Sequence, residues 1–145
     1  MNKLIEKYLL TLSEEERKNV HINKFAFGYE ENIQDALADL VLKGEKKATT
    51  SLYVLYDLEN ERVPKKGDIN IILNSKGEEV CITINTKVYR TPFKDVTKEF
   101  AFKEGEGDKS LEYWRKVHID FFMEETDGKF TEDMEVLCEE FELME

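Results

Sequence analysis

The sequence predicts a mixed α+β domain, in which helices flank a small, mainly antiparallel sheet that curls toward a barrel. Two observations support this fold class. Apolar residues recur with helical spacing in several segments, of which 31–43 and 110–123 are the clearest. Four other segments, rich in β-branched residues or alternating apolar with polar ones, indicate strands: 49–56, 68–73, 80–90 and 134–143.

The first thirty residues predict two helices and a short extended segment. Residues 2–12 carry apolar side chains at helical spacing. Ser13 and Glu16 fit a capping box, so a second short helix is expected to begin there. The stretch "HINKFAFGYE" indicates a loop or a short extended segment. We expect one domain over residues 1–145, with a helical extension at about 1–20.

Later segments end at recognisable residues. Gly44 stands where a glycine commonly ends a helix, directly after the predicted helix 31–43. The stretch "NSKGEE" predicts a hairpin turn between two strands. "DVTKEFAF" predicts a short helix that ends at the glycines of "EGEGD". In the last strand, residues 134–143, the apolar alternation changes register, as it does at a β-bulge.

Composition and charge limit the classes of function. The net charge of −11 and the pI of about 4.8 argue against broad adhesion to nucleic acid, so duplex DNA is not an expected partner. Residues 124–145 hold ten acidic side chains, which we expect to form a solvated face. Neither a membrane-spanning apolar run nor a signal-peptide core is present, which favours a cytoplasmic location. Cys81 and Cys138 lie in apolar patterns and are expected to be reduced core thiols.

One junction in this acidic chain gathers positive charge and hydroxyl groups. The stretch "KGEKKATTS" places Lys43, Lys46 and Lys47 before two threonines and a serine. Lys43 could complement the negative end of a helix, and the other two lysines could be solvated loop residues. Alternatively, a turn could bring Lys46 and Thr49 together, where the pair would activate a nucleophile or hold an anion. Activation would require burial, or a cation such as Lys47, to lower the pKa of Lys46.

A second candidate is the acidic, glycine-containing stretch "KEGEGDKS". It carries Glu104, Glu106 and Asp108 within five residues. A metal loop is one interpretation, but the EF-hand pattern is absent. Another is a loop that presents one carboxylate as a general acid or base. A third is a charged helix–helix connection in which Asp108 or Ser110 caps the next helix.

The helix 110–123 carries several aromatic side chains on one face. Trp114, Phe121 and Phe122 could stack on bases, but at helical spacing they are typical of a core. His118 shares this face and could be a core or boundary histidine. With only two histidines and two apparently buried cysteines, no zinc site is expected, and we predict neither a metal nor a cofactor.

These motifs together resemble the ASCH domain family, which is similar to the PUA domain. The resemblance runs from about residue 25 to 143 and is sharpest in two places. The first is Gly44-x-Lys46-x-x-Thr49. The second is Glu104-Gly105-Glu106-Gly107-Asp108, followed by Leu111, Tyr113, Trp114, Arg115 and His118. The resemblance implies a small β-barrel flanked by helices, with a cleft beside the Gly-x-Lys-x-x-Thr turn and an association with RNA.

One branch of that family hydrolyses an acylated cytidine to cytidine and a carboxylic acid. Carried over by motif, its lysine, threonine and glutamate fall on Lys46, Thr49 and Glu104. In this reading Thr49 attacks the acyl carbon or positions water, Lys46 takes the proton, and Glu104 protonates the leaving amine or orients the base edge. Lys46 would then have to be partly neutral; a charged Lys46 would instead bind an anion or support an oxyanion.

The resemblance also implies residues around the ligand and leaves alternatives open. The residues expected to line the ligand site are Lys47, Ser51, Glu106, Trp114, Arg115 and His118. Ser51 stands where the hydrolase branch typically has arginine, which is a departure from its pattern. The expected partner is a small nucleoside or single-stranded RNA. The alternatives are a non-catalytic RNA- or nucleotide-binding module, and a ribonuclease that uses Lys46, Arg115 and His118.

Overall fold

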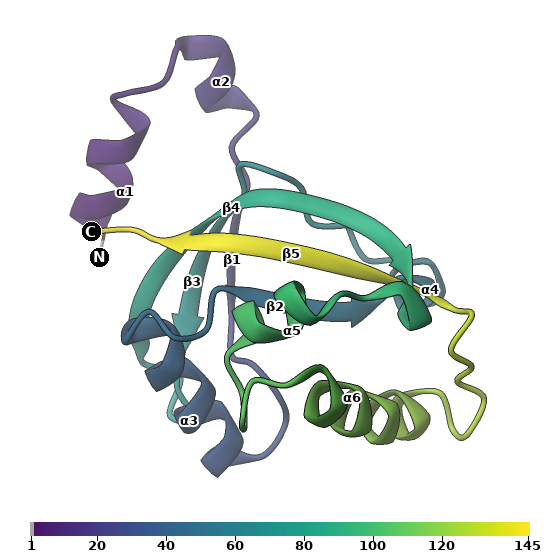
Figure 1. Ribbon diagram of the computed structural model, residues 1–145. Helices are drawn as coiled ribbons and strands as arrows, with labels where there is room; N and C mark the ends of the chain where they lie inside the picture. Colours follow the sequence, from purple (N-terminus) through teal and green to yellow (C-terminus); the bar gives the residue numbers. More distant parts are fainter. Residues whose placement is uncertain (1) are drawn as a thin grey trace.

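The computed structural model describes residues 2–145, which form an α+β fold (Figure 1). The helices are α1 Asn2–Leu9, α2 Glu14–Lys18, α3 Glu31–Leu42, α4 Tyr53–Leu58, the 3-10 helix η1 Phe93–Asp95, α5 Lys98–Glu104 and α6 Leu111–Glu125. The strands are β1 Ile22–Phe25, β2 Ala48–Leu52, β3 Ile69–Leu73, β4 Glu79–Pro92 and β5 Glu135–Leu143. Within this part of the chain, no helix is long and apolar enough to cross a membrane.

The five strands form one mixed sheet in the order β1-β3-β4-β5-β2. β1 runs parallel to β3, and the other three pairs are antiparallel. β1 and β2 form the two edges, so the sheet does not close into the expected barrel. The long strand β4 changes register between Asn85 and Lys87, opposite Phe141 and Glu140. The irregularity expected in the last strand therefore comes from an extra residue in its partner.

The segment 49–56 was predicted as one strand, and this prediction is wrong for its second half. β2 ends at Leu52, and the next residues form the short helix α4. In α4, Leu55 packs against the core while Val54 and Leu58 are exposed. A short run of apolar residues has no periodicity that separates a strand from a helix, which is why the pattern misled.

Three apolar clusters hold the helices to the sheet. The largest packs α5 and α6 against β2 and β5, with Phe93 stacked on Trp114 at a centroid separation of 5.1 Å. A second joins α3 to β3, β4 and β5, and a third joins α1 to β3 and β4. Figure 1 shows α5 and α6 beside β2, and α1 and α2 at the opposite side of the sheet. Cys81 and Cys138 are buried free thiols, as predicted.

Candidate functional site

The two motifs singled out in the sequence meet in space. The turn Gly44–Lys47 connects α3 to β2, and Glu104 is the last residue of α5. Gly105 adopts a φ of +75°, and a Cβ there would lie 2.2 Å from the backbone oxygen of Glu45. The Lys47 amide donates to the Lys103 carbonyl at 2.7 Å. Glycine is therefore needed at 105, because only a bare backbone can approach the Lys46 turn so closely.

Lys46 lies at the centre of this contact. Its side chain is 1% exposed, and its Nζ donates to the Ala48 carbonyl at 2.9 Å. It also donates to Glu104 Oε2 at 3.0 Å and to Glu106 Oε2 at 2.9 Å. The Phe27 ring lies 5.2 Å from the same nitrogen. An ammonium group has three N–H donors, so these three contacts use all of them.

Glu104 is equally buried and has several partners of its own. The hydroxyl of Thr50 donates to its Oε1. His118 Nε2 lies 3.5 Å from the same oxygen, while His118 Nδ1 lies 2.8 Å from the Trp114 carbonyl. A histidine flanked by two oxygens is best matched when both ring nitrogens carry protons. We call Lys46, Glu104, Glu106, His118 and Thr50 the ionic cluster.

The pKa values of the ionic cluster diverge. Burial acts to lower the pKa of Lys46, but the carboxylates of Glu104 and Glu106 outweigh it and raise that pKa. Burial acts to raise the pKa of Glu104, yet Lys46 and His118 hold it well below its ordinary value. Burial is the main cause that raises the pKa of Glu106. The charge of Lys46 acts to lower that pKa, and the charge of Glu104 acts to raise it. Burial acts to lower the pKa of His118, but its interaction with Glu104 outweighs burial and raises that pKa.

These shifts bear on the chemistry that each group could perform. Lys46 is an ammonium ion at neutral pH, so it does not supply the neutral amine that a general base requires. Glu104 is ionised and has no proton to donate. Of the two carboxyl groups, Glu106 is better suited to transfer a proton, because its pKa is raised. It is also more accessible, since its side chain is 24% exposed whereas that of Glu104 is 2% exposed.

The sequence analysis missed Thr50, and the strand geometry explains why it contacts Glu104. Side chains alternate between the two faces of β2, so Thr50 shares a face with the core residues Ala48 and Leu52. Thr49 points to the opposite face, where Glu139 of β5 is its cross-strand neighbour. Extending the alternation backward from the buried Leu52 would have distinguished the two threonines.

The other expected ligand-site residues are dispersed. Glu106 and His118 join the ionic cluster, whereas Ser51 Oγ lies 2.6 Å from the Tyr56 hydroxyl. Trp114 is buried in the core, and Arg115 forms an ion pair with Glu132. Lys47 is exposed and lines a cavity of about 260 Å³ together with Lys46 and Lys103.

A second polar group of residues, on the Thr49 face, was not anticipated from the sequence. Five polar side chains are buried there: Asp68, Asn70, Thr83, Asn85 and Glu139. We call them the amide network.

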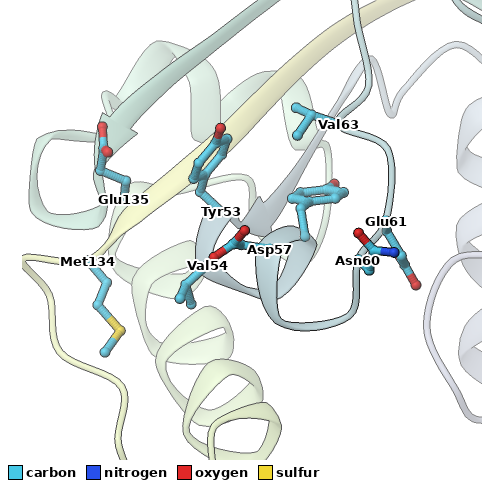
Figure 2. Close-up of a pocket in the computed structure, with 9 residues that line it drawn as sticks. Tyr53, Val54, Asp57, Asn60, Glu61, Val63, Met134 and Glu135 are labelled. Atoms are coloured by element: carbon cyan, nitrogen blue, oxygen red, sulfur yellow. The ribbon is translucent and has the colours of Figure 1, made fainter.

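A cavity of about 450 Å³ lies beside α4, lined by Tyr53, Tyr56, Asp57, Glu61 and other residues (Figure 2). Among residues 2–145, no group of three or more His, Cys, Asp and Glu side chains is placed to hold a metal ion.

Two features characterise this class of domain: the α+β fold, and the contact between Lys46 in the turn before β2 and Glu104 at the end of α5, which the close approach of Gly105 permits. The chain belongs to the ASCH domain family, whose model matches residues 23–145. It is similar to the crystal structure of an ASCH domain from Lactobacillus crispatus JV V101, with 34% identity, 98% of this chain and 92% of that chain covered, and a TM-score of 0.84.

Two further structures place the chain more broadly. A protein from Enterococcus faecalis V583 is 32% identical over 99% of this chain and 90% of its own, with a TM-score of 0.79. An ASCH protein from Zymomonas mobilis, 7% identical over 87% of this chain and 71% of its own, shares the fold with a TM-score of 0.54. The comparison with curated proteins found no match.

Proposed function

We propose that this ASCH domain hydrolyses an N-acylated pyrimidine nucleoside to a nucleoside and a carboxylic acid. The observation that supports the proposal most directly is that Glu104 and Glu106 share Lys46 while their pKa values are shifted in opposite directions. Carboxyl groups whose environments drive their pKa values apart take different roles, here a carboxylate that holds Lys46 and a carboxyl group that transfers the proton.

In this mechanism Lys46 provides a fixed positive charge. The ionised Glu104 holds the ammonium in place from one side, and Glu104 is itself held by the Thr50 hydroxyl. Substrate binding exchanges the contact between Lys46 and Glu106 for one between Lys46 and the acyl oxygen. Because the site is buried, a positive charge stabilises an oxyanion more strongly there than in water.

Glu106 moves the proton. It takes a proton from water as the water oxygen adds to the acyl carbon, and the resulting oxyanion lies against Lys46. The carbon–nitrogen bond then breaks, and Glu106 passes the proton to the leaving nitrogen, which releases the amine of the nucleoside and the carboxylic acid. A raised pKa suits a group that must both accept and release a proton near neutral pH. Glu106 thus replaces Lys46 as base and Glu104 as acid in the scheme expected from the sequence.

The test is turnover of N4-acetylcytidine followed by chromatography of the products. We expect Glu106→Gln to fold normally and to lose about 10²- to 10⁴-fold in kcat, because the amide cannot transfer the proton. Glu112→Gln, an exposed residue in the first turn of α6, is the matched control and should retain activity. Absence of turnover by the unmodified protein removes the proposal, and full activity of Glu106→Gln removes the role of Glu106.

A second candidate is non-catalytic binding of a nucleotide or single-stranded RNA. It is favoured by the saturation of all three Lys46 donors, which leaves none of them free for a substrate, and by exposed lysines nearby and in the α4–β3 loop: Lys47, Lys65 and Lys66. RNA affinity should then fall steeply as salt rises. No binding at low salt rejects this function, and cleavage of the RNA on a gel would indicate a ribonuclease instead.

A further inference from the structure

The amide network is a continuous chain of hydrogen bonds across four strands. Asp68 pairs with Arg62 through two hydrogen bonds of 2.7 and 3.0 Å. Asn23 of β1 donates to Asn70 Oδ1 at 3.1 Å, and Asn70 donates to Asn85 Oδ1 at 3.0 Å. Each asparagine amide is oriented by its neighbour, so the chain has a defined direction that leads toward β5.

Glu139 is the last member of this chain. Asn85 Nδ2 donates to Glu139 Oε1 at 3.0 Å, so that oxygen is fixed. Residues 2–145 supply no hydrogen bond to Oε2, and that atom is not sealed from solvent. Glu139 is 8% exposed overall and lies opposite Thr49 in the β2–β5 ladder. Residues directly opposite in an antiparallel pair have Cβ atoms about 5 Å apart, so a hydroxyl lies beside the carboxyl group.

The hydroxyl groups beside Glu139 extend toward a cavity. Within the same residues the Thr49 hydroxyl has no hydrogen-bond partner, and Ser51, two residues further along β2, contacts the hydroxyl of Tyr56. Tyr56 also lines the cavity of about 450 Å³ shown in Figure 2. Of this row of hydroxyl groups, Tyr56 lines the cavity, which is large enough for a nucleoside, and Ser51 and Thr49 lie between Tyr56 and Glu139 along β2.

The protonation state of Glu139 is set by groups on every side. Burial raises its pKa to about 7, and the hydrogen bond from Asn85 opposes that rise. The carboxylates of Asp68 and Glu104 also contribute to this raised pKa, whereas the charge of Lys46 acts against it. Lys46 and Glu104 of the ionic cluster are thus among the charges that act on the Glu139 carboxyl group. Near neutral pH a large fraction of the molecules carries a Glu139 O–H group, which is a hydrogen-bond donor.

We propose that Glu139 and Thr49 bind the pyrimidine base of the nucleoside, donate hydrogen bonds to its N3 and O2 atoms, and so select cytosine over uracil. This inference rests on the proposed function. Cytosine presents two adjacent acceptors at N3 and O2, which match two donors. Uracil carries a hydrogen on N3, which opposes a protonated carboxyl group and matches an ionised one. The base is bonded directly to the scissile amide, so its subsite must lie near the ionic cluster. Thr49, which faces Glu139, is adjacent in β2 to Thr50 of that cluster.

The experiment measures cytidine and uridine affinities by calorimetry over a pH range that spans the Glu139 pKa of about 7. The ratio of the two affinities cancels pH effects common to both ligands, such as those of Glu106 and His118. Because only the protonated fraction selects cytidine, the preference for cytidine should fall by up to about tenfold per pH unit above that pKa. Glu139→Gln keeps an N–H donor at every pH, so its preference should not change across the range.

Two further variants complete the design. Glu79→Gln, which removes an exposed ion pair with Lys24 on the same sheet, should show the pH dependence of the unmodified protein. Thr49→Val should weaken cytidine binding and leave the midpoint of the pH dependence unchanged. A pH-independent ratio in the unmodified protein, or the same pH dependence in Glu139→Gln, overturns the inference, as does absence of binding by either nucleoside.

The outcome separates this inference from the proposed function. Hydrolysis of N4-acetylcytidine by a protein whose nucleoside preference ignores Glu139 removes the base subsite alone. A pH-dependent preference for cytidine without hydrolysis upholds the subsite and removes the chemistry.

Discussion

The two polar clusters on opposite faces of β2 are stabilised in different ways. The ionic cluster places the Lys46 ammonium and the His118 ring against two carboxyl groups, and the charges of Lys46 and Glu104 compensate each other's burial. The amide network consists largely of asparagine and threonine side chains, joined by directional hydrogen bonds. Its Glu139 has no cation in hydrogen-bond contact among residues 2–145, and it responds to burial by holding a proton.

This difference shows how one sheet can carry a charged polar cluster on one face and a nearly neutral polar cluster on the other. In the ionic cluster, loss of one partner leaves a charge buried without compensation, which is very costly. In the amide network, a change of pH can neutralise the charge of the carboxyl group without breaking the network. The predictions below test this contrast from the largest expected effect to the smallest.

Removal of Lys46 should produce the largest effect. In Lys46→Met, Glu104 loses its main counter-charge while remaining 2% exposed, so the free energy of unfolding should fall by about 3–5 kcal/mol. Urea unfolding at neutral pH measures this loss. The double variant Lys46→Met/Glu104→Gln should recover most of it, because no uncompensated charge then stays buried beside Thr50. A double variant as unstable as the single one would contradict the charge-based account.

Glu139→Gln should change how stability depends on pH. The ordinary pKa of 4.5 applies in the unfolded chain, and the folded chain holds the proton up to about 7. Stability contributed by Glu139 is therefore present in acid and is lost as pH rises from 4.5 to 7, by roughly 3 kcal/mol in total. Relative to the unmodified protein, Glu139→Gln should be about equally stable in acid and more stable above pH 7.

The measurement is urea unfolding of both proteins at a series of pH values. Glu79→Gln is the control, and its stability should stay within about 0.5 kcal/mol of the unmodified protein. An equal stability difference at all pH values would mean that Glu139 is ionised in the folded state at neutral pH.

The sequence predicted those parts of the fold that depend on local signals. Ser13 and Glu16 form the expected capping box at α2, and Gly44, with a φ of +78°, follows the end of α3 as expected. The predictions that failed concern features that the local sequence does not determine. The open edges of the sheet depend on which strands pair, and the α4 helix begins inside an apolar run that fits either structure.

The site was predicted in part, for similar physical reasons. The motifs identified Lys46 and Glu104, which the structure places 3.0 Å apart. The sequence could not reveal that Lys46 is charged, because its pKa depends on two carboxylates 58 and 60 residues away. The acidic segment 124–145 was expected to be a solvated face, yet Glu139 within it is buried, since its side chain meets Asn85 only once the strands pair.

The smallest predicted effect compares two adjacent threonines. Thr50→Val keeps the shape and the strand preference of the side chain but removes the hydroxyl that donates to Glu104. A hydrogen bond to a charged group contributes about 2 kcal/mol, so we expect a loss of about that size in the free energy of unfolding. Thr49→Val, one residue earlier and on the opposite face, removes a hydroxyl with no hydrogen-bond partner among residues 2–145 and should change stability by less than about 0.5 kcal/mol.

Thermal and urea unfolding of the two variants, side by side, give the comparison under identical conditions. Both replacements occur in the same strand, so differences in strand propensity cancel and the two faces of β2 are compared directly. Equal losses would mean that the Thr50 hydroxyl contributes nothing specific to Glu104. A larger loss for Thr49→Val would place the stabilising hydroxyl on the Glu139 face of β2. The amide network, rather than the ionic cluster, would then be the cluster that a β2 hydroxyl group stabilises.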